Sequence, residues 1–316
     1  MPVADRGPAF DAALKTLLQH LREQAYEFIT VTPLSHARVL ANRAGKPGTS
    51  LRDAFGWSLP FPAPALPAEL LALLLHTGVI LREGELYRSQ VRVSSFDGDL
   101  FAHSAFPTTA RDAVFFGPDT YRFLNLIRDH MPAASADAPL RVADVGCGSG
   151  AGGIMAARLR VGAQVVLNDI NPLALCYAGI NAAAAGVAVE LAPGDALSAI
   201  SGDFDVVLSN PPYLEDDAAR AYRHGGGDLG RALSVRIGAQ AVQRLSPGGR
   251  LILYTGVAIV DGVDFFIREM EPFLGQAGCT YTYAEIDPDV FGEELERPVY
   301  RHADRIAAVG LIAVKA

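Results

Sequence analysis

The stretch best suited to chemistry is Asn210-Pro211-Pro212-Tyr213, which directly follows the apolar run 204–209. That run predicts a buried strand, and open α/β sheets bind their ligands at the carboxyl ends of such strands. The two prolines fix φ and bias the residue before them toward extended geometry, so we expect Asn210 to be held rigidly. Its amide could then bind a planar NH2 group. Asn and Pro are also ordinary turn residues, so the other strand ends must decide between the two interpretations.

A glycine-rich segment, 144–150, reads Asp-Val-Gly-Cys-Gly-Ser-Gly and connects a predicted strand to an alanine-rich helix. Its glycines, Gly146, Gly148 and Gly150, let the backbone turn sharply and approach a ligand closely. Similar glycines open NAD sites, but the spaced third glycine of the dinucleotide fingerprint is missing here. Asp144 is placed to accept from an ammonium group, which NAD does not have. The segment therefore favours a ligand with an amino group.

Two more acids follow the next two predicted strands. Asp169 lies about 20 residues after the glycine-rich segment, where a ribose diol is held in sites of this kind. Asp195, in Gly194-Asp195-Ala196, could meet an adenine amino group. Each acid alone could be a turn residue or a helix cap. Together with Asp144 and Asn210, these acids give four polar residues at the ends of four predicted strands, which favours a single site.

From about residue 112, strand and helix patterns alternate, which predicts βαβ units and a parallel sheet. The predicted strands are 140–145, 164–168, 187–191, 204–209 and 250–254. Two further apolar segments, 280–286 and 306–314, predict a terminal antiparallel pair. The fold class is therefore α/β, with a domain over residues 108–316.

Residues 1–107 predict a smaller, mainly helical domain. Helical spacing covers 10–29 and 35–43, a proline-rich segment over 59–67 predicts a stiff extended connector, and a leucine-rich helix covers 68–76. Turns at 83–85 and 97–99 predict hairpins. Helices followed by hairpins suggest a winged-helix-like domain that either recognises a substrate or covers the larger domain as a lid.

Composition and charge restrict the functions open to the chain. Half of the 316 residues are hydrophobic and a fifth are charged, which is typical of a globular protein. The net charge of −8 comes entirely from residues 108–316, with 17 basic and 25 acidic residues, and nucleic-acid binders usually carry a basic patch. This disfavours a nucleic-acid partner without excluding it.

Three scattered cysteines give neither a disulfide framework nor a zinc site, so we expect no metal and a reducing, cytoplasmic setting. The first ten residues lack the pattern of a secretion signal, and the apolar run 70–75 is too short to span a bilayer. We therefore expect no membrane partner. The oligomeric state is left open.

These motifs resemble class I S-adenosylmethionine-dependent methyltransferases over residues 108–316. The Asn-Pro-Pro-Tyr turn resembles the group that methylates planar nitrogens, which includes HemK/PrmC-type glutamine methyltransferases and amino-methyltransferases of adenine and guanine. Residues 116–121 resemble the Pro-Arg-Pro-Glu-Thr-Glu segment of HemK/PrmC enzymes, with Gly117 in place of Arg. Residues 225–229 resemble their Gly-Gly-x-Asp-Gly-Leu loop, with Leu229 in place of Gly.

The resemblance implies a Rossmann-like, seven-stranded methyltransferase sheet and S-adenosyl-L-methionine as the cofactor. It implies that Asp144 and the glycine loop hold the methionine part, Asp169 the ribose and Asp195 the adenine. The full set of implied cofactor-binding residues is Asp144, Gly146, Cys147, Gly148, Gly150, Asp169, Ile170, Asp195, Ala196, Asn210, Pro118 and Thr120. The implied catalytic residues are Asn210, Pro211, Pro212 and Tyr213. Asn210 and the Pro211 carbonyl would accept the N–H bonds of the acceptor, and Tyr213 would pack on it.

Several functions remain open at this point. The preferred one is N-methylation of a glutamine or asparagine amide in a protein or peptide. Alternatives are methylation of adenine or guanine amino groups in RNA or DNA, methylation of a small metabolite, and a non-catalytic, S-adenosylmethionine-binding interaction protein. His224 is either a base or a loop residue, and residues 287–305 are either a substrate lid or a surface loop.

Overall fold

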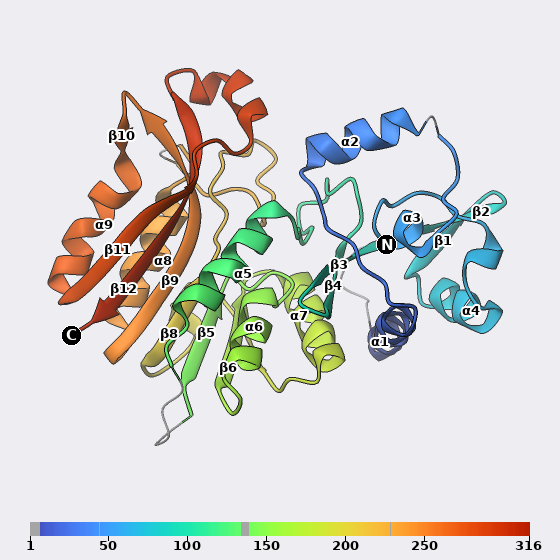
Figure 1. Cartoon of the computed structure of the whole chain (residues 1–316), viewed down its shortest axis with the longest axis horizontal. Coiled ribbons are helices and arrows are strands. Elements are labelled where there is room, and N and C mark those ends of the chain that lie inside the picture. The colour runs from blue at the N-terminus through green and yellow to red at the C-terminus, as the bar shows by residue number, and fades with distance from the viewer. Residues whose placement is uncertain (1–6, 44, 134–138, 228) are drawn as a thin grey trace.

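The computed structural model describes residues 7–43, 45–133, 139–227 and 229–316 and places the alternating C-terminal elements in one central sheet (Figure 1). The strand order is β11-β12-β9-β8-β5-β6-β7, and a short strand, β10 (Val263–Asp264), pairs with β9. The seven main strands are β5 (Arg141–Val145), β6 (Gln164–Asp169), β7 (Glu190–Pro193), β8 (Phe204–Ser209), β9 (Leu245–Val260), β11 (Cys279–Asp287) and β12 (Arg305–Lys315). The expected α/β class with a Rossmann-like sheet is confirmed.

Neighbouring strands from β7 to β9 are parallel, whereas β12 runs antiparallel to both β9 and β11. The terminal antiparallel pair expected from the sequence is therefore present. The predicted strand 187–191 is displaced: residues 187–189 precede the strand, which begins at Glu190. Val187 instead caps the preceding helix, where its N–H donates to Ala182 O at 3.0 Å.

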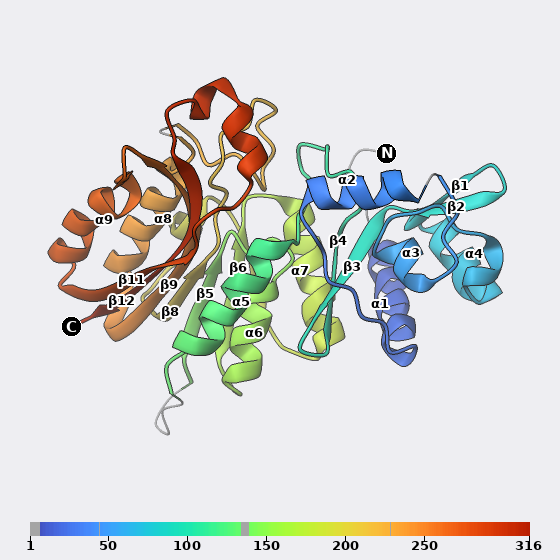
Figure 2. The same cartoon turned by 45° about the horizontal axis from the view of Figure 1, so that its top comes forward.

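Helices cover both faces of the sheet (Figures 1 and 2). One face packs α5 (Pro118–His130), α6 (Ala151–Leu159) and α7 (Pro172–Ala185), and the other packs α8 (Ala232–Gln243) and α9 (Phe265–Gln276). Successive residues of β8 alternate between the two cores, with Val206 and Leu208 in one and Val207 in the other. Strands buried on both faces read as continuous apolar runs, which is why the sequence reveals them so directly.

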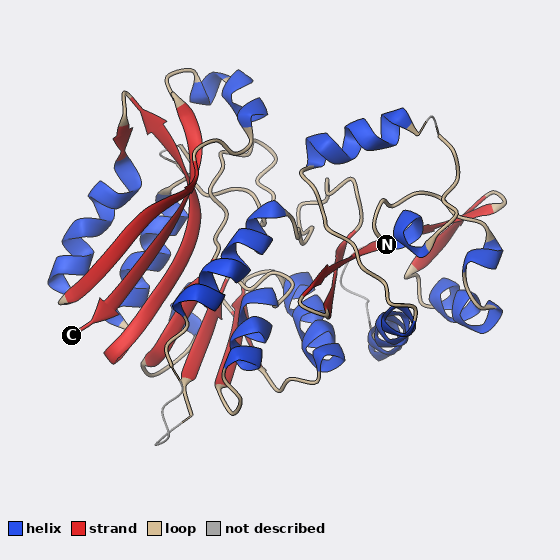
Figure 3. Cartoon of the chain, viewed as in Figure 1, coloured by secondary structure: helices blue, strands red, loops and turns tan. Residues whose placement is uncertain are grey.

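In its described residues, 7–43 and 45–107, the N-terminal part combines four α-helices with two hairpins (Figure 3). The helices are α1 (Pro8–Glu23), α2 (Pro33–Asn42), α3 (Leu51–Phe55) and α4 (Ala68–His76), and the strands are β1 (Ile80–Glu83), β2 (Leu86–Ser89), β3 (Val91–Phe96) and β4 (Asp99–Ser104). Its core is shared with α7, which contributes Tyr177 and Ile180. The winged-helix likeness and the domain boundary at residue 107 stay predictions.

Two sequence expectations for this part are wrong. The first helix ends at Glu23 rather than at residue 29, because Ala25 turns the chain with φ +49° and Phe28 packs edge-on against Trp57 from an extended segment. The proline-rich segment is not a free extended connector. It contains a 3-10 helix, Ala63–Ala65, and its buried Phe61 exchanges two backbone hydrogen bonds of 2.8 Å with Tyr87.

One buried amide, Asn181 of α7, connects the two parts of the chain. Its Oδ1 accepts from Ala102 N at 2.8 Å, and its Nδ2 donates to Ala102 O at 3.0 Å and to Ser149 O at 2.9 Å. Asn181 thereby joins strand β4 to the glycine-rich loop after β5. Within the described ranges, no helix is long and apolar enough to cross a membrane.

Replacing Asn181 should destabilise the whole chain. Asn181→Ala leaves a buried N–H and two buried carbonyls without partners, which costs about 3 kcal/mol of unfolding free energy. Urea denaturation measures this cost, with Gln276→Ala at the exposed end of α9 as the control. A loss below about 1 kcal/mol would show that water replaces the amide and that the connection is not stabilising.

Candidate active site

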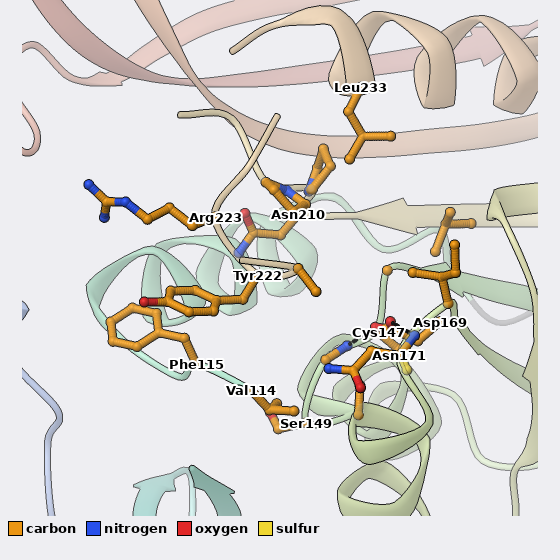
Figure 4. Close-up of a pocket in the computed structure, with 18 of the residues that line it drawn as sticks. Val114, Phe115, Cys147, Ser149, Asp169, Asn171, Asn210, Tyr222, Arg223 and Leu233 are labelled. Atoms are coloured by element: carbon orange, nitrogen blue, oxygen red, sulfur yellow. Dashed lines mark hydrogen bonds between the residues drawn. The ribbon is translucent and has the colours of Figure 1, made fainter. Parts of the chain in front are cut away.

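A pocket opens at the carboxyl edge of the sheet, where β5, β6 and β8 end (Figure 4). It brings most of the sequence-predicted residues together. Those that line it are Thr120, Asp144, Gly146, Cys147, Gly148, Asp169, Ile170, Asp195, Ala196, Asn210, Pro211, Pro212 and Tyr213. Pro118 and Gly150 do not line it: Pro118 begins α5, and Gly150 caps α6 beneath Leu167 and Ala178.

The glycine-rich loop needs its glycines for backbone geometry. Gly146, Gly148 and Gly150 have φ of +69°, +54° and +80°, in the left-handed region that other residues rarely adopt. The Asp169 carboxylate fixes the loop from the next strand, because it accepts from Gly148 N at 2.9 Å and from Asn171 N at 2.8 Å. Asp169, at the end of β6, therefore links that strand to the glycine loop that follows β5.

Asp144 lies beneath the loop and is almost fully buried. It accepts from Gly153 N at 2.8 Å, and burial, with Asp169 nearby, raises the pKa of its carboxyl to about 7. The same burial holds the pKa of the Cys147 thiol well above its usual value. A thiol kept protonated is a poor nucleophile, so the geometry agrees with a packing role for Cys147.

Asp195 is engaged by a residue that the sequence did not suggest. Its carboxylate makes a two-point ion pair with Arg236 of α8, at 2.7 and 2.8 Å, and this pair lowers the pKa of Asp195. Roughly half of the Asp195 side chain is exposed. A contact between Asp195 and an adenine therefore stays a prediction.

Asn210 stands where β8 ends, next to Ser209, whose hydroxyl donates to Val145 O at 2.8 Å and ties β8 to β5. In the residues that the structure describes, the Asn210 amide has no hydrogen-bond partner. It projects between the Asp169 end of the pocket and the ring of Tyr222 (Figure 4). A rigidly mounted, half-buried amide is thus free to bind a ligand.

Tyr213 is anchored in the core. Its hydroxyl donates to Asp119 Oδ2 at 2.6 Å, and Tyr254 donates to the other oxygen at 2.7 Å. The ring packs so closely on β9 that a Cβ at Gly256 would lie 2.1 Å from it. Burial raises the pKa of Asp119, while the two hydroxyls and Arg122 oppose that shift. The expected packing of Tyr213 on an acceptor is not tested by this geometry.

Gly225 and Gly230 pack directly behind the Asn-Pro-Pro-Tyr turn. Gly225 N donates to Leu214 O at 2.8 Å, and Gly230, with φ +89°, would place a Cβ 2.1 Å from Tyr213 O. Asp228 lies outside the described residues. His224 Nδ1 accepts from Asp216 N at 3.3 Å, so it holds the loop together and its role as a base stays a prediction.

Residues 287–305 lie against the loop that follows Tyr213 (Figure 1). Tyr300 accepts at its hydroxyl from Glu215 N at 2.8 Å, and Glu294 forms an ion pair with Arg223. Phe291 lines the pocket and lies 6.3 Å from Tyr213, measured between ring centroids. The segment therefore borders the site, and its function as a lid stays a prediction.

Sequence reasoning missed several pocket residues, among them four polar or aromatic ones and one supporting acid. Phe115, Asn171, Tyr222 and Arg223 line the pocket, and Asp119 both lines it and holds Tyr213. Asp119 could have been found, because it lies in the segment 116–121 already compared with a family motif. The loop that carries Tyr222 has no periodicity to mark it. Among the described residues, no group of His, Cys, Asp or Glu is arranged to hold a metal.

Comparison with known proteins agrees with this geometry. Residues 124–258 match the family model described as methyltransferase small domain. The chain is 32% identical over 164 residues to a release factor glutamine methyltransferase from Deinococcus radiodurans, covering 49% of this chain and 55% of the relative. It is 38% identical over 125 residues to a ribosomal RNA small subunit methyltransferase C from Chromohalobacter salexigens, covering 39% of this chain and 34% of the relative. The chain thus spans about half or less of the curated relatives it matches.

A solved structure supports the fold. Trm5b from Pyrococcus abyssi aligns with a TM-score of 0.50 at 16% identity, over 75% of this chain and 62% of that one. The family match and the named relatives identify S-adenosyl-L-methionine as the cofactor. The residues of the pocket fit it: Asp144 and Asp169 supply carboxylates below and beside a glycine loop.

Removing Asp119 should destabilise the turn that carries Asn210. Asp119→Ala leaves two buried tyrosine hydroxyls without an acceptor, which costs about 3 kcal/mol of unfolding free energy in urea denaturation. The matched control is Tyr254→Phe, which removes one hydrogen bond and keeps the carboxylate, so its cost should be about 1 kcal/mol. Equal costs for both variants would contradict this role for Asp119.

Cofactor affinity should depend on pH through Asp144. A carboxyl with a pKa of about 7 is half protonated at pH 7, and only its charged form attracts the cofactor ammonium. Calorimetry should therefore show binding about eightfold weaker at pH 6 than at pH 7.5. Asp144→Asn should bind more weakly and lose this pH dependence. A wild-type affinity that stays constant from pH 6 to 7.5 would remove Asp144 from the ammonium contact.

Proposed function

We propose that the chain, whose residues 124–258 match the model of the methyltransferase small domain, N-methylates the side-chain amide of glutamine or asparagine in a protein or peptide. The observation that carries the proposal is the Asn210 amide, which is rigidly held, unpartnered among the described residues and directed into the pocket. Asn210 can bind a planar NH2 group through its own amide. The relatives named release factor glutamine methyltransferase support this acceptor.

The proposed chemistry follows from the acceptor's electronic structure. An amide nitrogen is a poor nucleophile because its lone pair is delocalised into the carbonyl group. The Asn210 amide oxygen and the Pro211 carbonyl would each accept one N–H bond, which draws the nitrogen toward pyramidal geometry and directs its lone pair at the methyl group. This mechanism requires no strong general base.

The bound cofactor would supply an electrophilic methyl group, and the chain's own residues would orient it. Asp144 would accept from its ammonium and Asp169 from its ribose hydroxyls, because both line the pocket beside the glycine loop. The adenine would lie against Ile170 and the turn of Asp195 and Ala196. The Arg236 ion pair fixes that turn, so the backbone there can bind the adenine edge.

Charge at the pocket rim favours a protein over a nucleic acid. Residues 213–224 and 287–305 border the site and together carry nine acidic residues against five arginines, a net charge of −4. Arg220, Arg223 and Arg297 are already ion-paired, with Asp216, Asp217 and Glu294. Phosphate contacts need available cations, and this rim offers few.

Methylation of an amino group in RNA is the second candidate. It is favoured by the relatives named ribosomal RNA small subunit methyltransferase C, which match this chain at a similar identity. An Asn-Pro-Pro-Tyr turn suits an exocyclic amine as well as an amide. Binding to total RNA that weakens steeply as the salt concentration rises would favour this candidate.

The acceptor class and the role of Asn210 can be tested together. A lysate from a strain lacking this protein is incubated with the enzyme and labelled cofactor, and the protein, nucleic-acid and small-molecule fractions are separated. We expect the label in protein. Asn210→Ala should reduce labelling by about 100-fold or more, because it removes an acceptor that acts on the transition state.

Cofactor affinity provides the control. Asn210→Ala should bind S-adenosylmethionine within about twofold of the wild type in calorimetry, because the methionine and ribose contacts stay in place. A variant that labels protein at the wild-type rate would disprove the role of Asn210. If the label appears in RNA alone, the amide acceptor is wrong and methylation of an RNA amino group takes its place.

A further inference from the structure

Two aromatic rings, those of Phe115 and Tyr222, form one wall of the pocket beside Asn210 (Figure 4). Their centroids are 5.5 Å apart and their planes meet at 30°, so the rings stack. Both side chains are half-buried, and both line the pocket. They lie at the Asn210 end, away from Asp169 and the glycine loop (Figure 4). The wall therefore faces the acceptor and not the cofactor.

The Tyr222 ring is held in place by its hydroxyl. That hydroxyl donates to Thr108 O at 3.0 Å and lies 3.2 Å from Thr108 Oγ1, and Arg220 Nη1 donates to it at 3.4 Å. Thr108 is buried in the segment that connects the N-terminal part to α5. A ring anchored from this segment cannot swing freely with its own loop.

The Phe115 ring occupies space that is open because residue 117 is a glycine. A Cβ at Gly117 would lie 2.4 Å from two atoms of the ring, so any larger residue would displace it. Gly117 has φ −155°, an extended conformation open to every residue type. Space for Phe115, and not backbone conformation, therefore requires glycine at the position where the compared family motif has arginine.

The wall is assembled from two segments far apart in sequence, since Phe115 precedes α5 and Tyr222 follows the Asn-Pro-Pro-Tyr turn. The two fixed rings present a flat, apolar, uncharged surface. They line the same pocket as the Asn210 amide, which can accept hydrogen bonds from N–H groups. A flat, neutral group gains contact area on such a surface. A carboxylate would lose its hydration there, because Arg223, a cation that lines the same pocket, is already ion-paired with Asp216 and Glu294.

We propose that Phe115 and Tyr222 are the specificity-determining residues of the acceptor site, and that they select a planar, neutral carboxamide on a peptide side chain. The carboxamide packs flat against the wall while Asn210 accepts from its NH2 group. This inference rests on the proposed N-methyltransferase function and adds the element that chooses the acceptor.

The test uses the full chain, labelled cofactor and two probes. One probe is a library of blocked pentapeptides with glutamine at the centre and varied flanks, and the other is total RNA. A matched library with alanine at the centre gives the background. The variants are Tyr222→Leu, which removes the ring, Tyr222→Phe, which keeps the ring without its hydroxyl, and Gly117→Ala, which displaces Phe115. Tyr281→Leu, on the exposed surface of β11, controls for the loss of a tyrosine.

The proposal predicts a change in KM and not in kcat. Tyr222→Leu and Gly117→Ala should each raise KM for the glutamine library about tenfold with kcat within about twofold, because they remove binding that acts equally on ground and transition states. Tyr281→Leu should keep KM within about twofold of the wild type, whereas Tyr222→Phe should raise KM about threefold, because it keeps the ring but removes the hydroxyl that anchors it. Every variant should keep its affinity for S-adenosylmethionine.

Two results would overturn the proposal, and they differ from failure of the proposed function. If the wild type methylates the glutamine library and Tyr222→Leu has the wild-type KM, the wall does not select the acceptor, although the amide function stands. If Tyr222→Leu and Tyr222→Phe weaken cofactor binding equally, the ring is a structural support. If the wild type labels RNA and leaves the glutamine library at background, the amide function itself is wrong.

Discussion

The buried carboxylate of Asp119 is the interaction on which the geometry of the site depends. It accepts from two tyrosine hydroxyls, Tyr213 in the turn after β8 and Tyr254 in β9, and it opens the first turn of α5. An isolated buried carboxylate is costly, so its position depends on those two donors and on Arg122, whose guanidinium lies 3.4 Å away. One acid therefore fixes three segments relative to each other. Asn210 gains its direction from that arrangement, because it lies three residues before Tyr213.

Glycines complete the same arrangement by leaving space. Gly256 lies under the Tyr213 ring, and Gly225 and Gly230 let a second loop approach the backbone of the turn within distances that any Cβ would block. Two prolines then stiffen the turn from within. The acceptor site is thus rigid for two separate reasons: a hydrogen-bonded anchor on one side and close backbone packing on the other. Catalysis by orientation requires this kind of rigidity.

The sequence predicted the parts of the site that local patterns encode. Apolar runs marked the strands, and Asp144, Asp169 and Asn210 lie at or directly after their carboxyl ends, so the two ends of the pocket could be anticipated. Contacts between residues that lie far apart in the sequence could not be anticipated. Arg236 reaches Asp195 from α8, and Tyr222 meets Phe115 only after the chain has folded. Phe28 fitted a helical spacing by coincidence, because it is buried from an extended segment instead.

The N-terminal part is coupled to the site through the core that it shares with α7. Asn181 of that helix bonds to Ala102 in β4 and to Ser149 in the glycine loop, so one side chain connects the hairpin directly to the loop. At the other end of the pocket, Thr108 holds the Tyr222 ring from the connecting segment. The pocket is therefore supported from the N-terminal side at both its glycine loop and its aromatic wall. An element that contacts both ends can align them, which a separate, loosely attached domain could not do.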